Sequence, residues 1–362
     1  MRSVFIIGAG ASNEIGMPIG TDLRNNIIDI LTKVKNHRTS RVLGGNKSSL
    51  DMELPDHIKA ARDAILEYKR YSIKEVDKSI FNLDEIIISL ELTSSIDNLL
   101  YDFRDVPEIQ AIGKIAIVSA ILRAESDCAL GKTSNNHKIK PTLEGTWYYS
   151  LFLELNKQAN LNTFIRRLSN VYFIIFNYDR TLEYYFYNSI RRFYKTTADE
   201  TADIINNMNI YHPYRQVGFL EFQREEIKTE FGFIDIDNIY AISSLIKTFM
   251  LDNFNDDEDY KKARSFLYEA EKIFLLGFAF YPQNIDLLFP NKIKNSMKDD
   301  REIIISLSNS NYYGTFYKIS KINQGDIVNR IKAKNERISS FFTFEGKCVD
   351  FFDEFANIIS FC

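Results

Sequence analysis

Residues 4–12 read VFIIGAGAS, and this stretch decides the fold class of the chain. Its first four residues are β-branched or aromatic, which is typical of a buried strand in a parallel sheet. The apolar run stops at Gly8, where a turn of small residues begins. A helix is expected after the turn, because Thr21 or Asp22 can cap it and apolar residues then recur at helical spacing. We therefore predict a unit of strand, loop and helix.

Comparable apolar runs return later in the chain, separated by helical patterns such as residues 182–193. The later runs cover residues 171–176, 209–212, 272–277 and 302–308. Because alternating strands and helices favour a doubly wound and mostly parallel sheet, we expect a Rossmann-like α/β fold. Ligands of such sheets bind beyond the carboxyl ends of the strands, so the residues that follow each run are candidate site residues.

Strand signals vanish from about residue 36, and helical patterns replace them. Helices are expected around residues 60–68, 83–103, 109–125 and 147–155. We interpret residues 36–164 as an inserted helical subdomain, and residues 1–35 and 165–362 as the α/β core. Within the insertion, the loop-like segments 44–49 and 131–140 are candidate lids. A Phe-rich helix at about residues 349–360 is expected either to close the core or to face a partner.

Composition and charge restrict the classes of function that need to be considered. The chain has 362 residues, 45% of them hydrophobic, which is enough for a large core in one or two domains. Lys and Arg number 45 against 49 Asp and Glu, and they form no long stripe, so direct nucleic-acid binding is not indicated. Three widely spaced cysteines indicate neither a disulfide framework nor a zinc ribbon. The longest apolar run is too short for a membrane span, and we expect a cytoplasmic protein.

The glycine loop at residues 8–12 lies between a predicted strand and a predicted helix. In this setting small residues bring backbone N–H groups against a pyrophosphate at a helix N-terminus. Asn13 stands where the GxGxxG pattern has its third glycine, so the fingerprint of ordinary Rossmann dehydrogenases is not met. A dinucleotide-binding loop and a tight turn without a ligand both remain open at this point.

The sequence GAGASNEIGMP at residues 8–18 resembles the first motif of the sirtuin family, in which a GAGxS loop precedes a small-residue turn and a proline. The resemblance implies that this loop wraps the phosphates of NAD. The implied cofactor-binding residues are Gly8, Ala9, Gly10, Ser12 and Asp22. The chain departs from the family at residues 19–22, which read IGTD where deacylating sirtuins carry a DFR segment. This departure counts against acyl-lysine chemistry.

A second motif, FNYD at residues 176–179, follows the next strong strand. With Leu182 and Glu183 it resembles the NYDxxLE form of bacterial defence sirtuin domains. An asparagine side chain is both a donor and an acceptor, so Asn177 can hold a water or the nicotinamide ribose without titrating. Asp179 is a candidate to orient Asn177, and capping the helix that starts near residue 181 is an equally good role for it.

His212 ends the short strand predicted at residues 209–212, where a crossover would bring it close to Asn177. The resemblance implies that His212 is the general base acting on ribose hydroxyls. The following residues depart from the family, because YHPY at residues 211–214 replaces its usual His-Gly pair. The alternative is that His212 is an ordinary surface residue or a satisfied core residue.

Two later elements are candidates for the adenosine half of NAD. Gly277, Phe278 and Asn284 belong to or follow the run LLGFAF, which looks like the later strand and loop of sirtuin-like domains. A buried strand with a glycine turn explains this run equally well. Ser308 ends the strand predicted at residues 302–308 and is a candidate for hydrogen bonds to adenine or ribose.

These motifs predict an NAD hydrolase that releases nicotinamide and ADP-ribose, with NAD as substrate and no metal. The zinc-binding cysteine quartet of deacylating sirtuins is absent from the sequence. Two alternatives stay open: a deacylase or ADP-ribosyl transferase of the same fold, and a sensor that binds NAD or an ADP-ribose derivative without turnover. The resemblance further implies an abortive-infection effector in antiphage defence. Such effectors form homo-oligomers and work with a partner, for example a HerA-type ATPase or a short Argonaute.

Overall fold

A six-stranded sheet forms the centre of the computed structural model. The structure describes residues 2–42, 54–72, 83–131, 143–235, 237–247, 257–289, 309–335, 337–359 and 361. The strands are β1 (Ser3–Ile7), β2 (Val171–Ile175), β3 (Asn209–Tyr211), β4 (Lys272–Leu276), β5 (Ser310–Thr315) and β6 (Ile338–Phe344). All neighbouring strands pair in parallel, in the order β3-β2-β1-β4-β5-β6. This is the strand order of dinucleotide-binding Rossmann folds, and the expected α/β fold is confirmed.

One aromatic ring from each of five neighbouring strands stacks across a single face of the sheet. The stack runs through Phe173, Phe5, Phe274, Tyr313 and Phe342. Successive ring centroids lie 5.8, 4.7, 5.3 and 5.0 Å apart. These residues are also paired in the strand register, so the aromatic contacts favour the same alignment as the backbone hydrogen bonds.

Helices cover both faces of the sheet, as successive residues of β2 demonstrate. The ring of Phe173 packs against Phe186 of α10 (Thr181–Tyr194), whereas Tyr172 packs against Phe266 of α13 (Glu258–Glu269). A strand buried on both faces needs apolar residues at every position, and all five residues of β2 are buried. This double burial explains why β1, β2 and β4 are continuous apolar runs.

The predicted C-terminal helix closes the core on the face of the aromatic stack. It is present as α17 (Cys348–Glu354) and α18 (Ala356–Ile359). The ring of Phe352 contacts Phe5 in β1 and Trp147 in α8 (Trp147–Asn156), and Phe351 is also buried. Of the two roles expected for this helix, the structure therefore shows core closure.

Four of the predicted strands are confirmed as β1 to β4, and two observed strands were not predicted. The strand predicted at residues 302–308 lies outside the described residues. Immediately after it, β5 has the sequence SNYYGT, and β6 reads ISSFFTF. Both strands mix polar and aromatic residues, so neither shows the continuous apolar run that marks the central strands.

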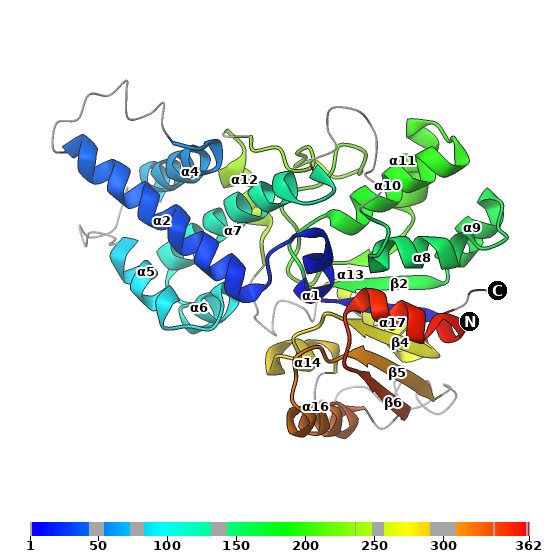
Figure 1. The fold of residues 1–362 in the computed structure, drawn as a ribbon. Coiled ribbons are helices and arrows are strands. Elements are labelled where there is room, and N and C mark those ends of the chain that lie inside the picture. Colours follow the sequence, from blue (N-terminus) through cyan, green and yellow to red (C-terminus); the bar gives the residue numbers. More distant parts are fainter. Residues whose placement is uncertain are drawn as a thin grey trace.

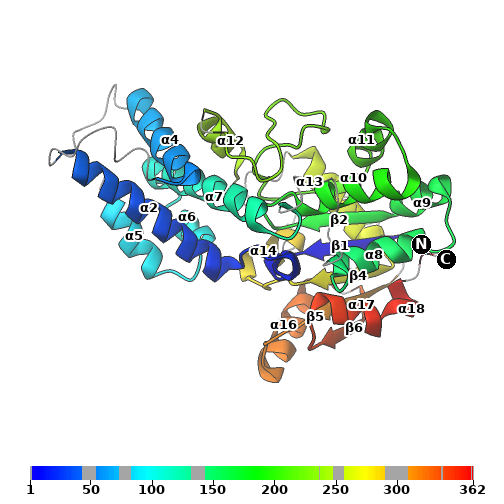
Figure 2. The same ribbon diagram turned by 45° about the horizontal axis from the view of Figure 1, so that its top comes forward.

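A layer of helices gathers beyond one side of the sheet in both views (Figures 1 and 2). Its helices are α2 (Gly20–Val42), α4 (Asp56–Ser72), α5 (Leu83–Glu91), α6 (Ile96–Asp102), α7 (Pro107–Asp127) and α12 (Ile239–Leu245). The largely apolar α7 packs against α2, α4, α6 and α12. The helix predicted at residues 83–103 is divided into α5 and α6, because Ser95 caps α6 by accepting the amide of Asn98 at 3.2 Å.

Chain order and packing are not collinear in the helical layer. Helix α12 follows β3 yet packs against α4 and α7, whereas α8 packs against α10 and α17 beside the sheet. The domain boundaries at residues 36 and 164 stay a prediction. Residues 44–49 and 132–140, the candidate lids, lie outside the described residues.

The remaining helices connect or cover the strands. They are α1 (Ala9–Ser12), a 3-10 turn (Asn13–Ile15), α9 (Leu161–Leu168), α11 (Ala198–Asn206), α14 (Pro282–Leu288) and α16 (Lys321–Lys334). Among the described helices, none has the length and apolar character that crossing a bilayer requires.

Candidate functional site

The glycine loop connects β1 to α1 at the point where the strand order reverses. On one side of β1 the chain continues to β2 and β3, and on the other side to β4, β5 and β6. Loops diverge at such a switch point and leave a crevice outside the carboxyl ends of the strands. The fold therefore positions residues 8–12 where dinucleotides bind in Rossmann-like proteins.

The turn after β4 packs directly on this loop. The amides of Gly8 and Gly10 donate to the carbonyl oxygens of Leu276 and Gly277, at 2.9 and 3.0 Å. A Cβ atom on Gly8 would lie 2.5 Å from the Gly277 oxygen, and one on Gly10 would lie 2.9 Å from the Gly277 Cα. The two loop glycines are thus required by backbone packing. The Gly10 amide already donates to the Gly277 carbonyl, so it can bind a phosphate only if the turn at Gly277 moves away.

Ser12 is the centre of a buried network that joins the glycine loop to the segment after β2. Its Oγ accepts a hydrogen bond from Asn177 Nδ2 at 2.9 Å and donates to Asp179 Oδ1 at 3.4 Å. The Tyr148 hydroxyl of α8 lies 3.2 Å from Ser12 Oγ and 2.7 Å from Thr181 Oγ1. The structure therefore brings together Ser12, Asn177 and Asp179, three residues that the sequence analysis singled out separately.

Asp179 joins the start of α10 to the glycine loop, and it is linked to Asn177 through Ser12. Its Oδ1 accepts the amide of Thr181 at 3.2 Å and the Thr181 hydroxyl at the start of α10, and it also accepts the hydroxyl of Ser12. Burial raises the pKa of Asp179 to about 6, although the hydrogen bonds from Thr181 lower it. Asp179 thus caps α10 and anchors the network that holds Asn177.

His212 follows β3 and is buried between two hydrogen-bond acceptors. Its Nδ1 lies 3.1 Å from the backbone oxygen of Asn177, and its Nε2 lies 2.9 Å from Glu183 Oε1. Burial lowers the pKa of His212, but the charge and hydrogen bond of Glu183 and the hydrogen bond to Asn177 raise it, and the net shift is upward. Neither ring nitrogen is free to accept a proton in this arrangement.

Three residues of the site were not predicted from the sequence. Glu183 belongs to the quoted NYDxxLE motif, and this motif was the signal for it. Tyr148 is 136 residues from Ser12, and no local pattern marks such a contact. Trp147 belongs to the same group, because its Nε1 donates to the carbonyl of Ala11 at 3.0 Å.

A buried ion pair ties the segment after β2 to the helical layer. Arg180 Nη2 lies 2.6 Å from Glu125 Oε2 of α7, and both side chains are fully buried. Glu125 also accepts the backbone amide of Arg180 at 3.0 Å and that of Gly232 at 3.1 Å. Losing one partner would leave a buried charge uncompensated, so the pair fixes the position of α7 relative to the site.

The later predicted residues lie after β4 and do not join the network around Ser12. Phe278 is buried, and its ring packs edge-on against Phe176 at 5.0 Å. Asn284 Oδ1 accepts the hydroxyl of Tyr214 at 2.5 Å. Gly277 adopts a left-handed conformation, and its amide donates to Thr315 Oγ1 at 2.8 Å. Ser308 lies outside the described residues.

Asp22 is exposed and lies in a different environment from Asn177 and His212. The helix α2 begins at Gly20, before the predicted caps Thr21 and Asp22, and Asp22 Oδ2 accepts the amide of Ile19 at 3.4 Å from within the first turn. Asp22 also lines a polar cleft of about 410 Å³ between α2, α4 and α7. The other lining residues include Asn13, Pro18, His57 and Arg123.

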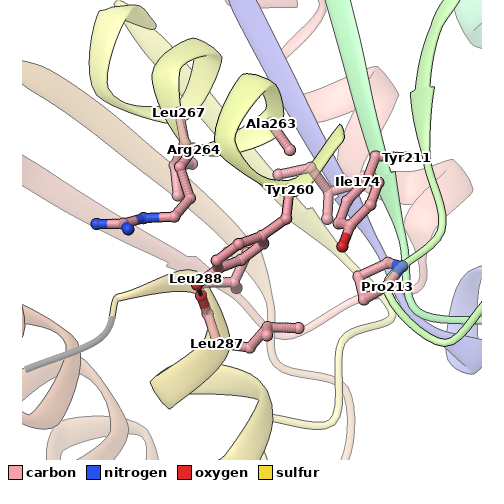
Figure 3. Close-up of a pocket in the computed structure, with 9 residues that line it drawn as sticks. All are labelled: Ile174, Tyr211, Pro213, Tyr260, Ala263, Arg264, Leu267, Leu287 and Leu288. Atoms are coloured by element: carbon pink, nitrogen blue, oxygen red, sulfur yellow. Dashed lines mark hydrogen bonds between the residues drawn. The ribbon is translucent and has the colours of Figure 1, made fainter. Parts of the chain in front are cut away.

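A second, much smaller cavity of about 10 Å³ lies on the α13 side of the sheet (Figure 3). Its walls are mostly apolar and come from Ile174, Pro213, Tyr260 and Leu287, among others. The hydroxyl of Tyr211 is buried here without a hydrogen-bond partner in the described part of the chain. A cavity of this size is at the lower limit of the space that one water molecule needs.

The described residues contain no cluster of three or more His, Cys, Asp or Glu side chains that could hold a metal ion. The site is instead defined by the contacts among Ser12, Asn177, Asp179, Glu183 and His212. No protein-family model and no curated protein matches this chain, so the function of the site must be inferred from its sequence motifs and its geometry.

Proposed function

We propose that the protein binds NAD at the carboxyl edge of the sheet and hydrolyses it to nicotinamide and ADP-ribose. One observation carries the proposal: Asn177 bonds Ser12 of the glycine loop through its side chain and His212 through its backbone oxygen. Three motifs that are far apart in the sequence thus meet at the switch point, where folds with this strand order bind dinucleotides.

The chemistry of NAD hydrolysis suits these residue types. Breaking the bond to nicotinamide passes through an oxocarbenium-like state, so a site must hold the ribose and position a water molecule. The contact with Ser12 uses one N–H of Asn177, which leaves the other N–H and Oδ1 for a water or a ribose hydroxyl. His212 would transfer a proton once one of its ring nitrogens is released.

Replacing Asn177 tests the proposal. We expect N177A to reduce nicotinamide release from NAD by at least about 100-fold, because the variant loses the group that orients the water or ribose. N207A is the matched control, since Asn207 is exposed at the end of α11 and its Nδ2 donates to the Asp203 carbonyl of the same helix. Unchanged turnover in N177A with intact circular dichroism would sink the assignment.

A sensor that binds NAD or ADP-ribose without turnover is the second candidate. Its support is the state of His212, which is buried and has both ring nitrogens engaged. Calorimetry with NAD, followed by product analysis, separates the two: heat of binding without nicotinamide favours the sensor. Repeating the reaction with an acylated peptide identifies a deacylase or transferase, because only these enzymes need an acceptor.

The proposed setting follows from the resemblance to bacterial defence sirtuin domains. We place the activity in the cytoplasm, as an abortive-infection effector that depletes NAD. Such an enzyme requires external control, so we propose a homo-oligomer regulated by a partner such as a HerA-type ATPase. Light scattering of the protein with and without its genomic neighbour tests this setting.

A further inference from the structure

The environment of His212 dictates where its protons are. An imidazole nitrogen next to a hydrogen-bond acceptor must carry a proton to make the contact. Nδ1 faces the Asn177 carbonyl and Nε2 faces the Glu183 side chain, and neither a carbonyl nor a carboxylate oxygen can donate. With Glu183 ionised, both contacts are made at once only by an imidazolium with a proton on each nitrogen.

We propose that Glu183 is a positioning residue that holds His212 as an imidazolium and so restrains the base in the resting site. The restraint on the base rests on the proposed function, because His212 acts as a general base only if the protein hydrolyses NAD. The protonation state itself does not depend on that function. Glu183 lies in the first turn of α10 and is 1% exposed, so bulk water does not screen its interaction with His212.

The charges around the ring support this assignment. Glu183 of α10 and Asp179 of the segment after β2 are the charged groups that favour the protonated ring. Glu183 Oε2 is buried without a hydrogen-bond partner in the described part of the chain, so the contact with His212 is what compensates this carboxylate. While Glu183 is ionised, losing this partner would leave its buried charge uncompensated.

The pair has a direct consequence for the proposed reaction. A general base must accept a proton, and His212 can do so only after Nε2 has lost the one that it shares with Glu183. The neutral ring then presents a lone pair to a carboxylate, which is unfavourable. Glu183 therefore moves the base-competent form of His212 to higher pH, and releasing this contact is a route to activation.

Nitrogen-15 NMR of the histidine side chains tests the protonation state without any reference to activity. The chain has four histidines, and the signals of His212 are assigned by their absence from H212Q. We expect two protonated ring nitrogens in the wild-type protein at neutral pH. A neutral imidazole with one unprotonated nitrogen overturns the proposal, and this result requires no variant of Glu183.

E183Q is the variant that isolates the carboxylate. A glutamine amide can donate to Nε2, so the neutral ring keeps its place, and we expect the pKa of His212 to fall by about one pH unit or more. E200Q is the control, because Glu200 is exposed in the capping box of α11. An unchanged pKa of His212 in folded E183Q contradicts the positioning role.

The pH profile of NAD turnover tests the restraint. We expect the acid limb of kcat to move to lower pH in E183Q, with turnover near pH 6 rising several-fold and KM little changed. An acid limb in the same place as in the wild type overturns the restraint. If neither protein cleaves NAD at any pH, the proposed function fails, and the NMR titration still decides whether Glu183 holds His212 charged.

Discussion

Asp179 illustrates how burial sets the charge state of single residues in this site. Its carboxyl group is surrounded by Ser12, Thr181 and the protein interior, and its pKa is raised to about 6. A carboxyl whose pKa is higher in the folded than in the unfolded state stabilises the fold below the unfolded value. This stability is lost as the pH rises from about 4 through about 6.

D179N removes this pH dependence. The amide oxygen still accepts the bonds of Thr181 and Ser12, so we expect D179N to be more stable than the wild type above pH 6, by up to about 3 kcal/mol. The difference should shrink to nothing below about pH 4, where Asp179 is protonated in both states. Urea denaturation of both proteins across this range measures it, and a difference independent of pH would contradict the account.

Individual site residues were predictable where they end an apolar strand. Asn177 and Asp179 follow β2 and His212 follows β3, and parallel strands bring their carboxyl ends to one edge. Their partners were not predictable in the same way. Glu183 and Tyr148 lie within helices, and whether a helical side chain faces the crevice depends on tertiary packing that periodicity does not specify.

At the scale of elements, the site depends on how closely the connections after β1 and β4 approach each other. Gly277 has φ of +56°, and a Cβ atom at this position would lie 2.0 Å from the Ala11 nitrogen. The atoms that a Cβ on Gly277 would contact belong to the backbone of Gly10 and Ala11, so no change of side-chain rotamer could relieve the clash. The distance between the two connections also fixes the shape of the glycine loop.

G277A should therefore destabilise the protein and disturb the loop. We expect the free energy of unfolding to fall by more than about 2 kcal/mol, because a left-handed alanine is strained and its Cβ clashes with Ala11. G325A is the matched control: Gly325 lies exposed within α16 with no atom near its Cβ position, and we expect a gain of about 0.5–1 kcal/mol. Equal stability of the two variants, measured by urea denaturation, would disprove the packing argument.

Elements were predictable in proportion to how completely they are buried. The central strands β1, β2 and β4 are apolar apart from Ser3 and Lys272 at the first positions of β1 and β4, because both faces of these strands are covered. The strand β6 forms an edge of the sheet, and its mixture of exposed and half-buried residues gave no continuous apolar run. A break such as Ser95 between α5 and α6 depends on one capping side chain within an otherwise helical pattern.

At the scale of the whole molecule, the helical layer and the sheet meet at the candidate site. The Arg180–Glu125 ion pair joins the segment after β2 to α7, and the Tyr178 hydroxyl donates to Asp97 of α6. Any movement of the helical layer would therefore be transmitted to residues that flank Asn177 and Asp179. The fold class was predictable from alternating strands and helices, whereas the strand order and the return of α12 to the helical layer were not.

The most direct test of the central claim follows NAD and nicotinamide over time with the purified wild-type protein, alone and with its genomic neighbour. The account predicts that nicotinamide and ADP-ribose appear in equal amounts as NAD disappears, without an acceptor, and that N177A abolishes the reaction. Undiminished NAD under both conditions, with or without binding, would contradict the proposal that this crevice is a hydrolase site.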